Sequence, residues 1–293
     1  MDALGIDMAE MERIRIEDVT YRYPDGTAAL KDISISVRAG EFVGLLGANG
    51  SGKTTLLQVA DGILKCASGR VMLDGQDISA LSPKEIYRRM GLVFQNPDNQ
   101  LFASTVAEDV AFGPINMGCD DRDVKERVAR ALASVEMEEL GGKAIGNLSF
   151  GQKKRACIAG LLAMGHEILL LDEPTSGLDP MGEYRMMGLL RKLNREQGVT
   201  ILMATHSVDM VPLFLSRLFI LSRGEVRRGG SPEEVFTAPE EMADVKLRLP
   251  QIAELIHELR HTDKVDFRRT PLTVGEARRM ILEKLEESGG QGK

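Results

Sequence analysis

The sequence predicts an α/β fold with a parallel sheet, an N-terminal antiparallel β subdomain, an inserted α-helical subdomain and a small C-terminal helical extension. Three patterns favour this fold. Apolar and polar residues alternate near the N-terminus, apolar residues recur at helical spacing in the middle of the chain, and short apolar strands alternate with helices after Asp172. Alternating strands and helices are typical of a parallel sheet covered by helices.

The N-terminal β subdomain is predicted from two stretches of alternating residues between Arg13 and Val37. Pro24-Asp25-Gly26 lies between the two stretches and has the residue types of a turn. The alternating apolar residues are Ile14, Ile16 and Val19, followed by Ile33, Ile35 and Val37. We therefore expect two paired strands.

The centre of the chain is expected to begin with a buried strand, Glu41 to Leu46, and a helix, Lys53 to Leu64. Short strands are expected at Gly69 to Leu73 and Gly91 to Phe94, with a short helix at Pro83 to Arg89 between them. These segments supply the first strands of the sheet.

The α-helical subdomain is predicted at about residues 96–165, where the pattern becomes helical. In the segment Asp123 to Leu132, the apolar residues that share one helix face are Val124, Val128, Ala131 and Leu132. A further helix is expected at Gly151 to Gly165. The subdomain is therefore inserted before the strand that ends at Asp172.

After Asp172 we expect helices at Gly182 to Gln197 and Ser207 to Leu215, alternating with strands at Val199 to Ala204 and Arg217 to Ser222. Three parts of the chain follow from these patterns: an N-terminal extension (1–12), a main domain (13–239) and a C-terminal helical extension (240–293). In the last part, helices are expected at 250–260 and 273–287, and the Gly-rich tail 288–293 is expected to be mobile.

Composition limits the possible functions. The chain has 293 residues and a net charge of −7, which suits one large domain with a small appendage and disfavours nucleic acid as a partner. Three cysteines without a CxxC pair indicate a reducing compartment. No apolar run approaches the roughly 18 residues that a membrane helix needs. We therefore expect any membrane role to go through partner proteins.

A glycine-rich stretch between the strand ending at Leu46 and the helix starting at Lys53 fits the phosphate-loop pattern G-x-x-x-x-G-K-[ST]. Its backbone amides can wrap phosphates, Lys53 can reach the β and γ oxygens, and the Thr54 hydroxyl can bind Mg²⁺. The expected nucleotide-binding residues here are Gly47, Ala48, Asn49, Gly50, Ser51, Gly52, Lys53, Thr54 and Thr55. The fold prediction is therefore an α/β phosphate-loop ATPase core.

Two acidic residues, Asp172 and Glu173, follow the apolar run Ile168 to Leu171. If this strand lies beside the phosphate loop, Asp172 can hold the Mg²⁺ shell through water, and Glu173 suits a general base for the attacking water. The alternative is a pair that only caps a helix, which does not account for two acids at the end of a buried strand.

Ser149 is expected to head the helix that starts near Gly151. Its hydroxyl and the amides of Gly151 and Gln152 would lie at the positive end of this helix, where anions bind. The nucleotide on the chain's own phosphate loop does not need this second anion-binding site.

Together these motifs resemble, in order and spacing, the nucleotide-binding subunit of ABC transporters over roughly residues 13–239. The resemblance implies a sandwich of two chains, in which Ser149, Gly151 and Gln152 contact the ATP on the partner chain. It also implies that Gln95 senses the γ-phosphate and responds to the signal that comes from the membrane partner. Asp179 lies in a stretch, 176–179, that resembles the loop linking the two sites of a dimer.

His206 resembles the switch histidine at the γ-phosphate, although a histidine that only ends a strand is the alternative. The site residues expected from the motifs and the resemblance fall into two sets. The catalytic set is Glu173, His206, Gln95 and Lys53, and the Mg²⁺ set is Thr54, Gln95 and Asp172.

Tyr23 resembles the aromatic residue that stacks on adenine, and Tyr21 is the competing candidate. Phe150 departs from the family's pattern, in which glycine is commoner at this place. Because Ser149 and Gly151 are kept, we expect activity to be retained, with altered packing where two chains meet.

A longer run gives a narrower resemblance. Residues 91–102 and 105–114 look like the ATPases of energy-coupling factor importers, including those for cobalt and nickel, and residues 21–26 resemble the same group. In that family the segment forms a groove for helices of the transmembrane coupling subunit. Thr105 and Glu108 also fit a capping box, so a simply capped helix is an alternative that is compatible with the first.

The narrower resemblance implies an ATPase that uses ATP and Mg²⁺ to power an importer for cobalt, nickel or a vitamin through ATP-driven dimer closure. The implied partners are a second ABC ATPase subunit, either this chain or a paralogue, a transmembrane coupling subunit and a substrate-binding membrane subunit. The implied location is the cytoplasmic face of the cell membrane. A soluble ABC-type ATPase and the ATPase of another importer class remain alternatives. Cargo, homodimer or heterodimer, and transport direction stay open.

Overall fold

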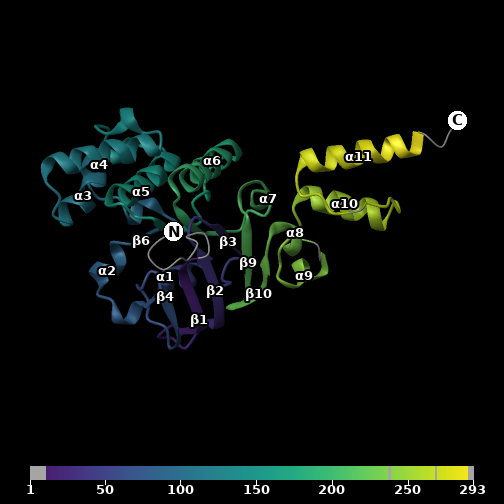
Figure 1. Cartoon of the computed structure of the whole chain (residues 1–293), viewed down its shortest axis with the longest axis horizontal. Helices are drawn as coiled ribbons and strands as arrows, with labels where there is room; N and C mark the ends of the chain where they lie inside the picture. Colours follow the sequence, from purple (N-terminus) through teal and green to yellow (C-terminus); the bar gives the residue numbers. More distant parts are fainter. Residues whose placement is uncertain (1–10, 237–238, 268, 290–293) are drawn as a thin grey trace.

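The computed structural model describes residues 11–236, 239–267 and 269–289. Most of the expected N-terminal extension, residues 1–10, and the end of the expected tail, residues 290–293, lie outside this range. Figure 1 shows two sheets below a group of helices, with the last helices at the far end of the molecule. Within the described ranges, no helix combines the length and the apolar character needed to cross a membrane.

The N-terminal β subdomain is a four-stranded antiparallel sheet in the order β2-β1-β4-β5. Its strands are β1 (Glu12–Arg22), β2 (Ala28–Arg38), β4 (Ser68–Leu73) and β5 (Gln76–Asp77). The turn between β1 and β2 falls at Pro24-Asp25-Gly26, so the predicted hairpin is confirmed.

The central sheet has six strands in the order β10-β9-β3-β8-β7-β6. All of its pairs are parallel except the edge pair of β9 and β10. The strands are β3 (Phe42–Leu46), β6 (Met90–Val93), β7 (Ile168–Asp172), β8 (Thr200–Thr205), β9 (Arg217–Ser222) and β10 (Glu225–Gly230). The predicted parallel sheet is confirmed, and β10 is an edge strand that the sequence pattern did not predict.

Both faces of the five parallel strands are buried, which explains why these strands are almost entirely apolar, whereas the edge strand β10 is polar and only partly buried. In β7, Leu169 and Leu171 belong to the core shared with the helices, whereas Ile168 and Leu170 belong to the core shared with the antiparallel sheet and α1 (Lys53–Ala60). The sheet therefore holds its loops between two packed layers.

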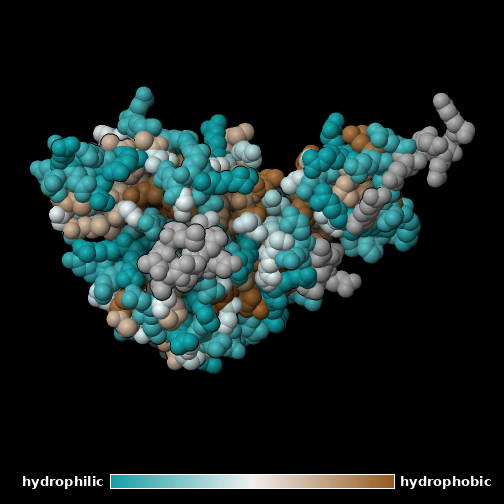
Figure 2. Space-filling view, in the orientation of Figure 1, coloured by the Kyte–Doolittle hydropathy of each residue, from teal (hydrophilic) through white to brown (hydrophobic). Residues whose placement is uncertain are grey.

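The helical group contains α3 (Val106–Asn116), α4 (Asp121–Ser134) and α5 (Phe150–Met164), which pack against one another (Figure 1). On α4 the predicted apolar face is directed inward, since Val124 and Leu132 are buried. All three helices fall within the expected subdomain at residues 96–165. Figure 2 shows a mostly hydrophilic surface on this side of the molecule, with hydrophobic residues along the seams between its parts.

Two predicted helices are shorter in the structure. The helix at Lys53 stops at Ala60 because Gly62 adopts a φ of +76°, outside the right-handed helical region. The helix predicted at Ser207 to Leu215 is wrong for its first half, because α7 spans only Val211–Phe214 and begins around Pro212, which favours the first turn of a helix.

The remaining core helices are α2 (Pro83–Tyr87), α6 (Pro180–Gln197) and α8 (Pro232–Val235). Short 3₁₀ turns are found at η2 (Ile78–Ala80), η3 (Pro97–Asn99), η4 (Glu138–Leu140) and η5 (Ile145–Asn147). These turns connect the longer elements, and η3 directly follows the segment that contains Gln95.

The C-terminal extension contains α9 (Pro239–Asp244), α10 (Gln251–His261) and α11 (Val274–Gly289). Asp209 anchors it to the core, since its carboxylate pairs with Arg248 and accepts a hydrogen bond of 2.8 Å from the Gln251 amide. Figure 1 shows α10 and α11 beyond the edge of the central sheet, away from the helical group. These two helices pack mainly on each other.

Candidate active site

Four chemically distinct segments meet at one edge of the central sheet, because the carboxyl ends of parallel strands share an edge. β3 ends in the phosphate loop, β6 leads to Gln95, β7 ends at Asp172, and β8 ends just before His206. The strand register places Asp172 beside Ala204 and Leu46 beside Thr205. The sheet therefore brings together residues that lie far apart in the sequence.

The phosphate loop requires glycine at specific positions. Gly52 has a φ of +107°, and a Cβ on it would lie 2.8 Å from the carbonyl oxygen of Ala29. A Cβ on Gly47 would lie 2.4 Å from the carbonyl oxygen of Leu221. Side chains at these positions would therefore force the loop to open, and its compact turn depends on their absence.

Lys53 is buried inside this loop. Its ammonium donates hydrogen bonds to the carbonyl oxygens of Gly47 at 2.7 Å and Ala48 at 3.3 Å, and lies 3.5 Å from Glu173 Oε1. The buried Oγ of Ser51 has no hydrogen-bond partner in the described part of the chain. A cation and an orphaned hydroxyl in a glycine cradle fit a polyphosphate, which supplies the acceptor oxygens that both groups can use.

The predicted Mg²⁺ ligands Thr54 and Asp172 lie together. The Thr54 hydroxyl is 2.9 Å from Asp172 Oδ2 and 3.1 Å from Oδ1. Burial raises the pKa of Asp172, the neighbouring Glu173 raises it further, and the Thr54 hydrogen bond and the ammonium groups of two lysines oppose these effects. A pair formed by the buried Asp172 carboxylate and the more exposed Thr54 hydroxyl, beside a phosphate cradle, is a donor set that suits a hard divalent cation.

Glu173 is held in an unusual backbone conformation, with a φ of +50°. Its amide donates to the carbonyl oxygen of Ala204 at 3.0 Å, and its carboxylate Oε2 lies 2.5 Å from His206 Nδ1. The His206 side chain is 57% exposed, whereas the Glu173 side chain is buried. The structure therefore brings the predicted base and the predicted switch histidine into direct contact. Strained backbone of this kind is found most often at functional sites.

Lys154 joins this site, and the sequence analysis did not single it out. It lies on α5, is 1% exposed, and its ammonium donates a hydrogen bond of 2.7 Å to the main-chain oxygen of Glu173. Burial lowers its pKa to about 8, although the carboxylates of Glu173 and Asp172 act in the opposite direction. The helical spacing of the sequence could have indicated its burial, because Lys154 shares a helix face with the buried residues Cys157, Ile158 and Leu161.

Of the residues predicted to face a partner chain, Ser149 and Asp179 are exposed, whereas Gly151 and Gln152 are half-buried. Ser149 caps α5, with its Oγ accepting from the Gln152 amide at 3.3 Å, while the Gln152 side chain accepts from the Ser149 amide at 2.9 Å. Asp179 caps α6 by accepting a hydrogen bond of 2.6 Å from the Gly182 amide. Gln95 lies exposed on the segment between β6 and η3.

The structure separates the two candidate stacking residues. Tyr21 is buried within the antiparallel sheet, where it pairs with Leu30. Tyr23 is half-buried, its ring meets the Tyr21 ring edge-on at 5.1 Å, and its hydroxyl shares a hydrogen bond of 2.9 Å with Thr55 Oγ1. Of the two rings, that of Tyr23 is the more accessible.

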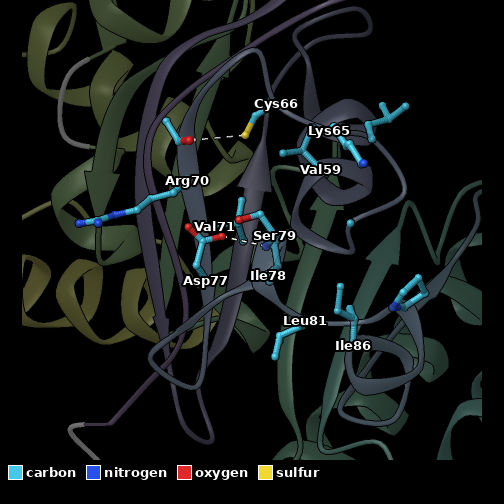
Figure 3. Close-up of a pocket in the computed structure, with 14 residues that line it drawn as sticks. Val59, Lys65, Cys66, Arg70, Val71, Asp77, Ile78, Ser79, Leu81 and Ile86 are labelled. Atoms are coloured by element: carbon cyan, nitrogen blue, oxygen red, sulfur yellow. Dashed lines mark hydrogen bonds between the residues drawn. The ribbon is translucent and has the colours of Figure 1, made fainter.

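A pocket of about 370 Å³ lies at the opposite end of α1 from Lys53 (Figure 3). Its lining combines apolar side chains, such as Val71 and Ile86, with Lys65, Arg70 and Asp77. None of the residues predicted for catalysis or nucleotide binding lines it. The cavity is therefore separate from the phosphate-loop site.

Comparison with known proteins agrees with this geometry. The family described as ABC transporter matches residues 30–176 of the chain. A protein of Geobacter sulfurreducens, provisionally named an ABC transporter ATP-binding protein, is 67% identical over 274 residues, which are 94% of this chain and 98% of the relative.

The names of two further relatives also state the type of transporter or the complex to which they belong. The energy-coupling factor transporter ATP-binding protein EcfA of Methanocaldococcus jannaschii is 46% identical over 276 residues, covering 94% of this chain and 98% of the relative. The solved structure of cbiO1 from Clostridium perfringens, described as part of the ABC transporter complex cbiONQ, is 44% identical with a TM-score of 0.74, and the match covers 85% of this chain and 100% of that one. The chain therefore belongs to the ABC transporter ATP-binding proteins and is an ATPase that resembles those of energy-coupling factor transporters.

Proposed function

We propose that this chain is the ATP-hydrolysing subunit of a membrane importer of the energy-coupling factor type. The observation that carries the ATPase assignment is the cluster of Lys53, Thr54, Asp172 and Glu173 at the carboxyl edge of the sheet. The likeness to EcfA and cbiO1 favours this transporter type over other importers and over a soluble ABC-type ATPase. Residues 13–239 would form the nucleotide-binding domain, with the helical subdomain at about 96–165.

The chemistry follows from the contacts of Glu173. Its buried carboxylate lies between the Lys53 ammonium and the exposed His206 imidazole, so it can accept a proton from a water that attacks the γ-phosphate of ATP. Lys53 and the loop amides orient the phosphates, and Thr54 and Asp172 would hold Mg²⁺. When bound, Mg²⁺ neutralises charge on the phosphate oxygens. Tyr23 supplies a ring on which adenine can stack.

The second half of the site is proposed to come from another chain. Ser149 caps α5, and Gly151 and Gln152 lie in its first turn. Ser149 is exposed, and its hydroxyl accepts a hydrogen bond from the Gln152 amide. Asp179 caps the next helix and is exposed as well. A second copy or a paralogue, docked on these loops, would complete two nucleotide sites, and ATP would draw the two chains together.

The membrane partner is proposed to dock on an apolar patch beside α3. Phe102, Phe112 and Ile115 are 63%, 49% and 58% exposed, and the two phenylalanine rings meet edge-on at 4.6 Å. Asp109 fixes the loop that carries Phe102, because its Oδ2 accepts hydrogen bonds from the amides of Phe102 at 2.9 Å and Ala103 at 3.1 Å. Exposed aromatic side chains on a rigid platform favour a partner interface.

The C-terminal extension, residues 240–293, is proposed to pack against its counterpart in the dimer. Among its described residues, the exposed large apolar side chains include Leu255, Val274, Leu282 and Leu285. Truncation after Pro239 should weaken dimer formation, as measured by light scattering with MgATP. Full dimerisation of the truncated chain would contradict this role.

The cargo is proposed to be cobalt, nickel or a vitamin, chosen by a separate membrane subunit. The chain would then lie at the cytoplasmic face of the membrane, held there by its partners. The test is purification of the tagged chain from its native membranes in mild detergent, followed by identification of the co-purifying proteins and assay of bound metal. A multi-span protein with a small substrate-binding membrane subunit supports the proposal. Recovery of the chain without a membrane partner favours a soluble ATPase.

The catalytic part has its own test in Glu173→Gln. The amide cannot accept the proton, so turnover should fall at least about 100-fold while ATP binding is retained and the dimer becomes trapped. Gel filtration with MgATP and a phosphate-release assay measure both effects. Normal turnover in this variant would exclude Glu173 as the base.

A further inference from the structure

The main-chain oxygen of Glu173 accepts hydrogen bonds from two parts of the structure. It accepts a hydrogen bond of 3.1 Å from the Ser176 amide, which closes the turn after β7, and one of 2.7 Å from Lys154 Nζ on α5. The first contact is local, whereas the second joins residues that are 19 positions apart. The turn that carries Glu173 is therefore tied to the helix that Ser149 caps.

Phe150 adds a second link between the same two elements. The Lys154 ammonium lies 5.1 Å from the centroid of the Phe150 ring. The same ring covers Gly177, because a Cβ on Gly177 would be 3.0 Å from Phe150 Cε1. The first turn of α5 thus contacts the segment after Glu173 through one buried ammonium and one half-exposed ring.

Burial of an ammonium group in a protein core is energetically unfavourable unless the group is hydrogen-bonded. The hydrogen bond of Lys154 is therefore the contact that indicates its role. Lys154 is 1% exposed, and its carbonyl acceptor belongs to a residue whose φ of +50° is unfavourable for a side chain that is not glycine. Such a conformation persists only where neighbouring groups fix it. Lys154 is a side chain that donates a hydrogen bond to this carbonyl, in addition to the main-chain hydrogen bond from Ser176.

We propose that Lys154 is a positioning residue for Glu173: its hydrogen bond fixes the peptide that aims the Glu173 carboxylate at Lys53 and His206. Because Lys154 lies on α5 and Ser149 caps this helix, a shift of α5 on docking of the partner chain changes the orientation of the carboxylate. Lys154 does not touch the substrate, and its effect is on catalysis rather than on ATP affinity. This role rests on the proposed function of Glu173 as the base.

The test compares Lys154→Met with Lys154→Gln in the full-length chain. Methionine fills a similar volume without a donor, so kcat for ATP should fall about tenfold or more, while KM for ATP and the dissociation constant of MgATP stay within twofold. Glutamine retains an N–H donor, so kcat should recover to within about threefold of the unmodified chain. Lys125→Met, an exposed lysine on α4, is the matched control and should change none of these values.

Two results would overturn the proposal. The first is a folded Lys154→Met variant with kcat within twofold of the unmodified chain. The second is a folded Lys154→Gln variant with less than a tenth of normal kcat, since the donor would then be insufficient. Should Lys154→Met fail to fold by circular dichroism, Lys154→Leu replaces it as the variant without a donor, with the same expected loss of kcat and the same overturning result.

A double variant separates this proposal from the proposed function. In the Glu173→Gln background, the positioning role predicts that Lys154→Met causes no further loss of the residual turnover. A further tenfold loss would show that Lys154 acts independently of Glu173. That result would contradict the positioning role and would leave the proposed function of Glu173 intact. If Glu173→Gln itself hydrolyses ATP normally, the proposed function fails whatever Lys154 does.

Discussion

The two halves of the proposed nucleotide site are built in opposite ways within one chain. Around the phosphate loop, Lys53, Asp172 and Glu173 are buried and contact one another or their neighbours directly. At the start of α5, Ser149 is exposed and bonds only within its own helix turn. The first half is preorganised by the fold, whereas the second half is a surface that, in our proposal, contacts the nucleotide of another chain. From this contrast we expect variants of the first half to weaken ATP binding and variants of the second half to reduce only ATP hydrolysis.

The largest expected effect comes from breaking the buried half with Lys53→Ala. This change removes an ammonium that is held inside the phosphate cradle, and each charged hydrogen bond is worth roughly 1.5–3 kcal/mol. We expect ATP affinity to fall at least about tenfold and hydrolysis at least about 100-fold. Isothermal titration calorimetry and a phosphate-release assay measure the two effects. Unchanged affinity would show that Lys53 serves only the loop's own carbonyl oxygens.

The exposed half should behave differently in Ser149→Arg. The larger cationic side chain would block the face that we assign to a partner, so hydrolysis should fall about 10- to 100-fold while the isolated chain binds ATP within twofold of normal. Mixing this variant with the Lys53→Ala variant restores one complete site, and we expect partial recovery of turnover if the chain forms a homodimer. A Ser149→Arg variant with weakened ATP binding would remove the contrast between the halves.

A smaller effect is expected from Tyr23→Ala at the edge of the buried half. Loss of the ring should lower ATP affinity about five- to tenfold, since stacking on one base contributes about 1–1.5 kcal/mol. Tyr23→Phe is the control: it keeps the ring, loses the hydrogen bond to Thr55 and should bind ATP nearly as well as the unmodified chain. Equal losses in both variants would point to the hydroxyl rather than to stacking.

The last expected effect is on stability rather than on ATP binding or hydrolysis, and it lies at the far end of α1. Burial raises the pKa of Asp61 from 3.8 to about 7, so the folded chain binds this proton more tightly than the unfolded chain. The stabilising contribution is therefore complete below about pH 4 and is lost as the pH rises to about 7.

Asp61→Asn cannot ionise, so the variant should gain about 1–2 kcal/mol relative to the unmodified chain at pH 8, after allowance for solvent screening. Below pH 4 the two chains should differ little. Urea unfolding at both pH values measures this difference. A constant difference between the two proteins across this range would show that Asp61 does not carry a raised pKa.

Local sequence patterns predicted much of the fold because they encode local preferences. The alternation in β1 and β2, the apolar run of β7 and the capping residue Ser149 were all confirmed as structure. The strand β10 was not predicted, because its hairpin turn places Arg223 at a φ of +53°, which a sequence pattern does not reveal. The helix expected at Ser207 to Leu215 is limited to α7, because Pro212 favours the first turn of a helix.

The sequence by itself determined the identity of the reactive groups, since a phosphate loop, an acidic strand end and a helix cap each depend on residues that are near neighbours in the chain. Only the tertiary structure decided which groups touch. It joined Glu173 to His206, buried Tyr21 while leaving Tyr23 accessible, and brought Lys154 beneath the turn that carries the acid. The physical reason is that these contacts join different strands and helices, and only the packing of the sheet against α5 sets their separation.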